Sequence, residues 1–111
     1  MAESSPRASD KTLGVLLGVG PSEVSFRYGI QLAATAQRSQ IQVYLYLLDD
    51  AINGMEDSEL NALIAAGAKV MACAYGARKR NLPLNDSITF GGLGLLNNLI
   101  TKTDRFVGFC H

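Results

Sequence analysis

The sequence predicts a three-layer α/β/α sandwich, in which a mainly parallel five-stranded sheet lies between two layers of helices. Short apolar runs alternate with helix-like stretches along almost the whole chain, a pattern typical of βαβ units with right-handed crossovers. The run at residues 12–19 is apolar on both faces, as expected for a central strand covered by helices on both sides. The chain has 111 residues and is 48% hydrophobic, which suits one domain with a substantial core.

Five strands are predicted from apolar runs that end in turn residues. If their order in the sheet is 2-1-3-4-5, an order of doubly wound folds, the third and fifth strands are two steps apart. Four strand residues are expected to be buried, namely Leu16, Val43, Val70 and Phe106. The predicted strands occupy residues 12–19, 41–48, 68–72, 87–90 and 105–109.

Helices are predicted in the intervals between the strands. Residues 75–81 are basic and form a short helix or a turn, and residues 82–86 form a loop. Leu95 is expected to lie off the inward face of the last helix. The first helix is expected to begin at Ser22 and the last at Gly91-Gly92. The second is expected to begin at Asp57 or Ser58 and to end at Gly67. The residues expected to face inward are Phe26, Ile30, Ala33, Ala34, Leu60, Leu63, Ile64, Leu93, Leu96, Leu99 and Ile100.

Composition narrows the classes of function. Ten basic and ten acidic residues give a net charge of 0, which argues against a nucleic-acid partner held by a basic surface. The longest nearly apolar run, residues 13–19, is far shorter than a membrane span of about 20 residues. Two cysteines without a Cys-x-x-Cys motif, together with one histidine, favour neither a disulfide scaffold nor a zinc site. We therefore expect a cytoplasmic protein with a flexible tail at residues 1–10 and one domain at residues 11–111.

Cys73 is the strongest candidate for chemistry. It ends a predicted strand and precedes a basic segment that contains Arg78. A thiol at a helix N-terminus meets the positive end of the helix dipole, which favours the thiolate. A thiolate can attack a sulfane sulfur and leave a persulfide on the protein. The alternative is a buried cysteine with a purely structural role.

Other polar or glycine-rich positions also fall at predicted carboxyl ends of strands, where sites form in open sheets. The turn at Gly18 and Gly20 resembles a phosphate-binding loop, but Glu23 stands where a dinucleotide fingerprint needs a small residue. We interpret this turn as one wall of a pocket around Cys73. Four candidates remain. Asp49 and Asp50 are interpreted as solvated loop acids, and Cys110 and His111 as residues of a frayed terminus.

One segment resembles a known family. Residues 67–80 read GAKVMACAYGARKR. They are similar to the reactive-cysteine segment in the DsrE/TusD group of the DsrE/DsrF-like sulfur-relay family, where a strand leads to a cysteine, small residues and a pair of arginines. The resemblance extends in pattern over residues 12–109, including the glycine-rich start of the last helix at residues 91–100.

The resemblance implies a flavodoxin-like fold without a bound cofactor and a trimeric or hexameric homo-oligomer. It implies a sulfurtransferase, or persulfide carrier, in which Cys73 takes sulfane sulfur from one protein and passes it to a thiol of another. Gly18, Gly20, Tyr75 and Arg78 are then expected to wall the substrate pocket. Two alternatives remain open: a non-catalytic domain that binds a small ligand or nucleotide, and a scaffold subunit of a sulfur-relay complex.

Overall fold

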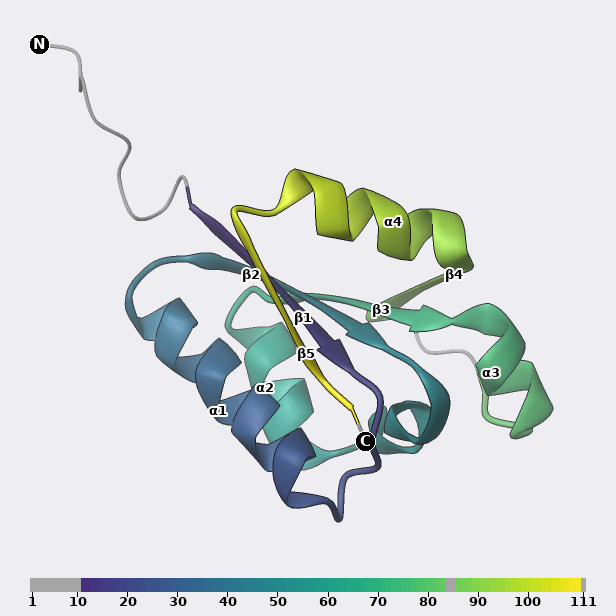
Figure 1. Ribbon diagram of the computed structural model, residues 1–111. Helices are drawn as coiled ribbons and strands as arrows, with labels where there is room; N and C mark the ends of the chain where they lie inside the picture. Colours follow the sequence, from purple (N-terminus) through teal and green to yellow (C-terminus); the bar gives the residue numbers. More distant parts are fainter. Residues whose placement is uncertain (1–10, 84–85, 111) are drawn as a thin grey trace, which may run out of the picture.

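The computed structural model describes residues 11–83 and 86–110 and has a five-stranded parallel sheet at its centre (Figure 1). The predicted three-layer architecture is confirmed. The tail proposed at residues 1–10, part of the loop at residues 82–86, and His111 lie outside the described residues. The strands are β1 (Thr12–Leu17), β2 (Gln42–Leu47), β3 (Lys69–Cys73), β4 (Ile88–Gly91) and β5 (Arg105–Phe109).

The strand order is β4-β3-β2-β1-β5, which differs from the order 2-1-3-4-5 considered from the sequence. Strands β1 to β4 step across the sheet in one direction, and only the crossover from β4 to β5 runs back. Right-handed crossovers in opposite directions place their helices on opposite faces. Hydrophobic periodicity carries no signal for the direction of a step, and the sequence therefore left the order undetermined.

The helices follow from these crossovers. One face of the sheet carries α1 and α2, whereas α4 covers the other face (Figure 1). A short α3 lies at the carboxyl edge and belongs to the first face, because its Ala77 joins the core cluster there. None of the described helices is long and apolar enough to cross a membrane. The bounds are α1 (Val24–Arg38), the 3-10 helix η2 (Asp49–Gly54), α2 (Ser58–Ala65), α3 (Ala74–Lys79) and α4 (Leu93–Lys102).

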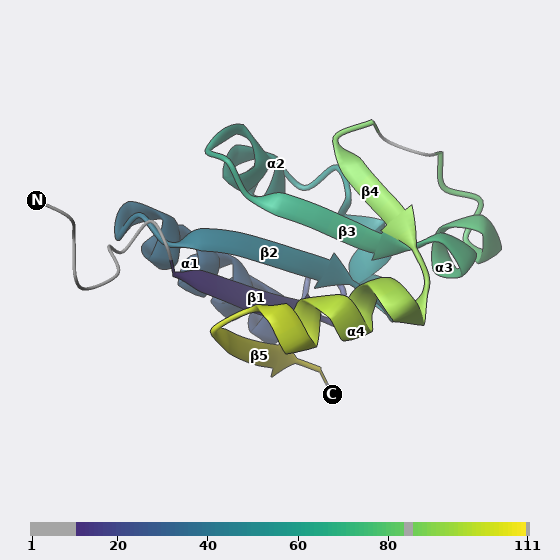
Figure 2. The same ribbon diagram turned by 90° about the horizontal axis from the view of Figure 1, so that it is seen from above.

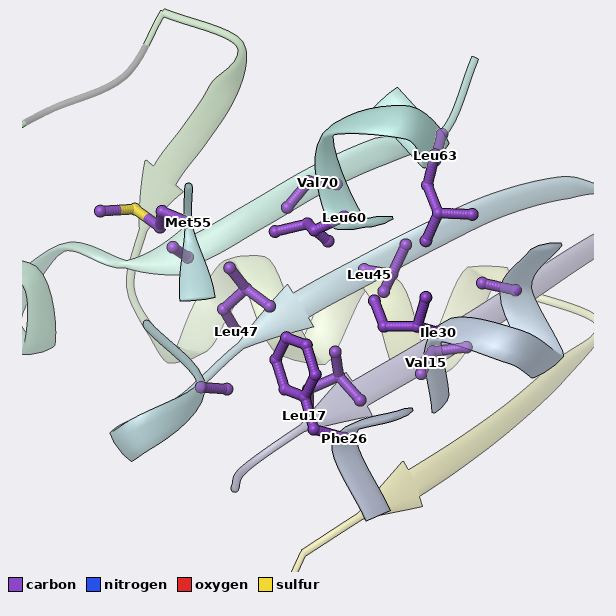
Figure 3. Close-up of a cluster of buried hydrophobic side chains, with 14 of the residues drawn as sticks. Val15, Leu17, Phe26, Ile30, Leu45, Leu47, Met55, Leu60, Leu63 and Val70 are labelled. Atoms are coloured by element: carbon purple, nitrogen blue, oxygen red, sulfur yellow. The ribbon is translucent and has the colours of Figure 1, made fainter. Parts of the chain in front are cut away.

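Most buried side chains form one cluster between the sheet and α1 and α2 (Figure 3). Val43 and Val70 belong to it, as predicted. Leu16 and Phe106, predicted to be buried, are instead half-buried. Both side chains point to the opposite face, where a smaller cluster packs under α4. A single ten-residue helix is too narrow to cover five strands, so part of this face stays accessible.

The orientation of α4 also differs from the prediction. Leu95 and Leu96 are half-buried and Leu99 is buried, whereas Leu93 and Ile100 are 73% and 46% exposed. Apolar residues occupy more than one side of this helix, so two stripes fit the helical period equally well. The stripe that contains Leu95 faces the sheet.

Helix ends were predicted with mixed success. The N-cap of α1 is Glu23, not Ser22, and its side chain makes no capping hydrogen bond. Asp57 caps α2 as expected, and its carboxylate accepts from the backbone N–H groups of Glu59 at 3.1 Å and Leu60 at 3.2 Å. Gly67 follows this helix with φ of +112°, a conformation that favours glycine.

Candidate functional site

Cys73 occupies a junction between a strand and a helix. It is the last residue of β3 and the N-cap of α3. Its Sγ accepts a hydrogen bond from the backbone N–H of Gly76 at 3.4 Å. A side-chain acceptor at this position satisfies an N–H that the first helical turn leaves unpaired. The residue as a whole is half-buried.

The strand order places Cys73 at a topological switch point. Cys73 lies opposite Gly91 in the register between β3 and β4. After these two neighbouring strands the chain enters α3 and α4, which belong to opposite faces of the sheet (Figure 2). In open parallel sheets, ligands bind in the crevice outside the carboxyl ends of such a strand pair. Cys73 therefore stands where this class of fold places its sites.

Tyr46 of β2 contributes a buried hydroxyl to the same region. The side chain is fully buried and belongs to the cluster under α4, against which Cys73 packs. Its hydroxyl donates towards the carbonyl oxygens of Gly91 and Gly92, each at 3.3 Å. Burial, and then the charge of the neighbouring Cys73, raise the pKa of Tyr46 above its usual 10.0. This tyrosine is not among the site residues predicted from the sequence.

The basic segment after Cys73 divides into exposed and anchored residues. Tyr75 is 66% exposed, and Arg78 is also exposed. Arg80 is the anchored cation, with Nη2 3.2 Å from Oδ1 of Asp50 and Nη1 donating to the carbonyl of Gly76 at 3.4 Å. This ion pair ties the end of α3 to the start of η2. Asp50 is thus more than the solvated loop acid that the sequence suggested.

The glycine turn after β1 is not adjacent to Cys73, because β2 separates β1 from β3. Two strand spacings amount to about 10 Å. A Cβ on Gly20 would lie 3.7 Å from Asp50, so this part of the turn reaches the Cys73 region through the Asp50–Arg80 pair. Gly18 instead adjoins Cys110, whose Sγ would lie 2.8 Å from a Cβ at that position.

Cys110 and Cys73 are both free cysteines. Cys110 follows β5, and in the observed strand order β5 is three steps from β3, not the two steps expected. Three strand spacings are about 14 Å, well beyond the Cα separation of about 7 Å that a disulfide permits. A direct bridge between the two thiols is therefore incompatible with this sheet.

Comparison with known proteins supports the fold. No protein-family model matches the chain, and no curated protein matches it either. Among solved structures, the YchN protein from Escherichia coli has a TM-score of 0.73 at 23% identity, covering 89% of this chain and 98% of that one. BT1422, a conserved protein of unknown function from Bacteroides thetaiotaomicron, has a TM-score of 0.67 at 13% identity, covering 93% and 99%. At such identities these likenesses show the fold alone, an α/β fold that this chain shares with both proteins.

Proposed function

We propose that this protein is a sulfur-relay protein that carries sulfane sulfur on Cys73 as a persulfide. In the loading step, the Cys73 thiolate attacks the outer sulfur of a donor persulfide. A new S–S bond forms at Cys73, the donor's S–S bond breaks, and the donor leaves as a thiolate. In the release step, an acceptor thiolate attacks the outer sulfur on Cys73 and regenerates the Cys73 thiolate. Neither step needs an external oxidant or reductant.

The observation that carries the proposal is the position of Cys73 at the switch point of the sheet, with hydrogen-bond donors around its sulfur. The backbone N–H of Gly76 donates to Sγ, and the first turn of α3 directs its dipole towards the same atom. The buried hydroxyl of Tyr46 lies beside it. Donors favour an anionic sulfur, which is the nucleophile in the loading step and the leaving group in the release step.

The exposed residues around Cys73 support protein partners as the sulfur donor and acceptor. Tyr75 follows Cys73 by two residues, and Leu93 follows Gly91, the residue opposite Cys73, by two residues. Their side chains are 66% and 73% exposed at the same edge of the sheet, where a contiguous apolar surface would suit a protein partner. Tyr75 and Arg78, with the turn at Gly20, would then contact the arriving partner, and Gly18 would border the far end of this surface.

The partly covered α4 face supports self-association. Leu16, Tyr44 and Phe106 are half-buried there, and Leu93 and Ile100 project outward from the helix. A second copy of the chain would bury this surface. Because the net charge is zero, two copies have no overall charge repulsion that opposes this contact. We therefore propose a homo-oligomer, a trimer or hexamer, in the reducing cytoplasm, where both thiols stay free.

The proposal is tested by intact-protein mass spectrometry after incubation with a sulfane-sulfur donor such as an alkyl persulfide. We expect the chain to gain the mass of one sulfur atom and to lose it again when a thiol acceptor is added. Cys73→Ser abolishes this gain, whereas Cys110→Ser, the matched control at the other free thiol, retains it. A chain that gains no sulfur, or gains it equally well as Cys73→Ser, would contradict the proposal and leave the scaffold or ligand-binding alternatives.

A further inference from the structure

We propose that Tyr46 is a positioning residue for the sulfur of Cys73: its buried hydroxyl turns from two backbone carbonyls to the anionic sulfur and holds it at the switch point. The role in sulfur transfer rests on the proposed function. The contact itself does not, and it can be tested on the thiol alone.

The sheet brings the two side chains to one face. Tyr46 lies opposite Met71 in the register between β2 and β3, and Cys73 is two residues beyond Met71 on the same side of its strand. Diagonal neighbours of this kind lie within reach of an aromatic side chain. In the structure Cys73 packs against the cluster that contains Tyr46.

The present partners of the hydroxyl hold it only weakly. A hydroxyl has one hydrogen, and here it is shared between two carbonyl oxygens that are both 3.3 Å away. The usual distance for an O–H···O hydrogen bond is about 2.8 Å. A charged acceptor forms hydrogen bonds that are roughly twice as strong as those of a neutral one. Because Gly91 lies directly opposite Cys73, a rotation about the C–O bond redirects the hydrogen from the carbonyls towards the sulfur.

Two further properties suit Tyr46 to this task. Its side chain is fully buried, so water does not compete for the hydroxyl. Its pKa is raised by burial and by the neighbouring Cys73, so the phenol remains protonated at neutral pH and acts as a donor. An ionised phenol at this position would instead repel the thiolate.

The experiment measures the rate of iodoacetamide alkylation of Cys73 against pH in a Cys110→Ser background. We expect Tyr46→Phe, which keeps the ring and removes the hydroxyl, to move the midpoint of this profile upward by about one pH unit. Persulfide loading below the midpoint should slow about threefold to fourfold. The loss is smaller than tenfold because a more basic thiolate is also more nucleophilic.

Tyr44→Phe is the matched control. Tyr44 lies on the same face of the same strand, but it is about 7 Å nearer the amino ends and lines a cavity of 230 Å³ beside α4. We expect this variant to keep the wild-type profile. The inference is wrong if Tyr46→Phe and the wild type give superimposable profiles, or if both tyrosine variants shift the profile equally. Neither result would contradict the proposed function, which is tested separately by the sulfur gain of the wild-type chain.

A second measurement does not depend on how well Tyr46→Phe folds. In the unaltered chain, NMR signals of the Tyr46 ring should respond as the Cys73 thiol titrates, and this response should vanish in Cys73→Ser. Ring signals that are insensitive to the thiol in the unaltered chain would overturn the proposal.

Discussion

At the scale of single residues, the groups that surround Cys73 come from distant parts of the chain. Tyr46 and Gly91 are 27 and 18 residues away along the chain. They meet Cys73 only because β2, β3 and β4 are neighbours in the observed order. The same reason explains Arg80: its partner Asp50 is set by the packing of α3 on η2, which no local pattern encodes.

Asp57 supports a prediction about stability at this scale. Its carboxylate caps α2 and pairs with Arg27 of α1, with Oδ1 2.7 Å from Nη2, and its side chain is only 13% exposed. The Arg27 guanidinium is the main reason that the pKa of Asp57 lies below its usual 3.8. We expect Asp57→Ala to lower the free energy of unfolding by about 1–2 kcal/mol at pH 7.

The pH dependence of this effect has a definite sign. Because the pKa of Asp57 is lower in the folded state, its contribution is complete above about pH 5 and is lost as the pH falls through 3.8 and below. Urea unfolding at several pH values should show the variant and the wild type converging in acid. Glu59→Gln, which removes the more exposed partner of Arg27, serves as the control and should have a smaller effect. A difference in the free energy of unfolding between Asp57→Ala and the wild type that stays constant between pH 7 and pH 3 would refute this account.

At the scale of elements, the strands were predicted most accurately because each is a short apolar run between turn residues. The strand predicted at residues 105–109 has the observed bounds of β5. The exposed faces were harder to predict, as the rotation of α4 shows, since Leu93, Leu95, Leu96, Leu99 and Ile100 offer two possible apolar stripes. The stripe that contains Leu95 and Leu99 packs against Tyr46 and Met71.

Two glycines give opposite predictions for neighbouring helices. An alanine at Gly76 would drive its Cβ into Cδ1 of Ile52, which packs η2 against α3. We expect Gly76→Ala to cost about 1–3 kcal/mol of stability and to slow persulfide loading, because α3 positions the N–H that donates to Cys73.

Gly94→Ala is the matched change in α4. A Cβ at Gly94 meets nothing within 4 Å, and alanine loses less backbone entropy than glycine when a helix forms. We expect the free energy of unfolding of this variant to rise by about 0.5 kcal/mol, and we expect persulfide loading at the wild-type rate. Equal effects of the two substitutions, measured by urea unfolding and loading rate, would mean that the close contact between α3 and η2 does not position the site.

At the scale of the whole molecule, the single returning crossover has a consequence for assembly. Among the described residues it places only α4 on one face of the sheet, and this face carries exposed apolar side chains. It also brings the start of α4, with Leu93, to the same edge as Cys73. The proposed assembly through this face and the proposed approach of partners to Cys73 would therefore both involve α4.

This arrangement predicts that changes on α4 alter the oligomeric state. We expect the double variant Leu93→Ser, Ile100→Ser to lower the molecular mass measured by light scattering at micromolar concentration, because it removes two exposed apolar side chains from the proposed contact. Val24→Ser is the control, since Val24 is 62% exposed but lies on α1, on the opposite side of the sheet. Wild-type chain that is monomeric at these concentrations would exclude the proposed oligomer. A mass that falls with the control but not with the α4 variant would move the proposed interface to the α1 face. The α4 end would then be free for the proposed sulfur-exchanging partners.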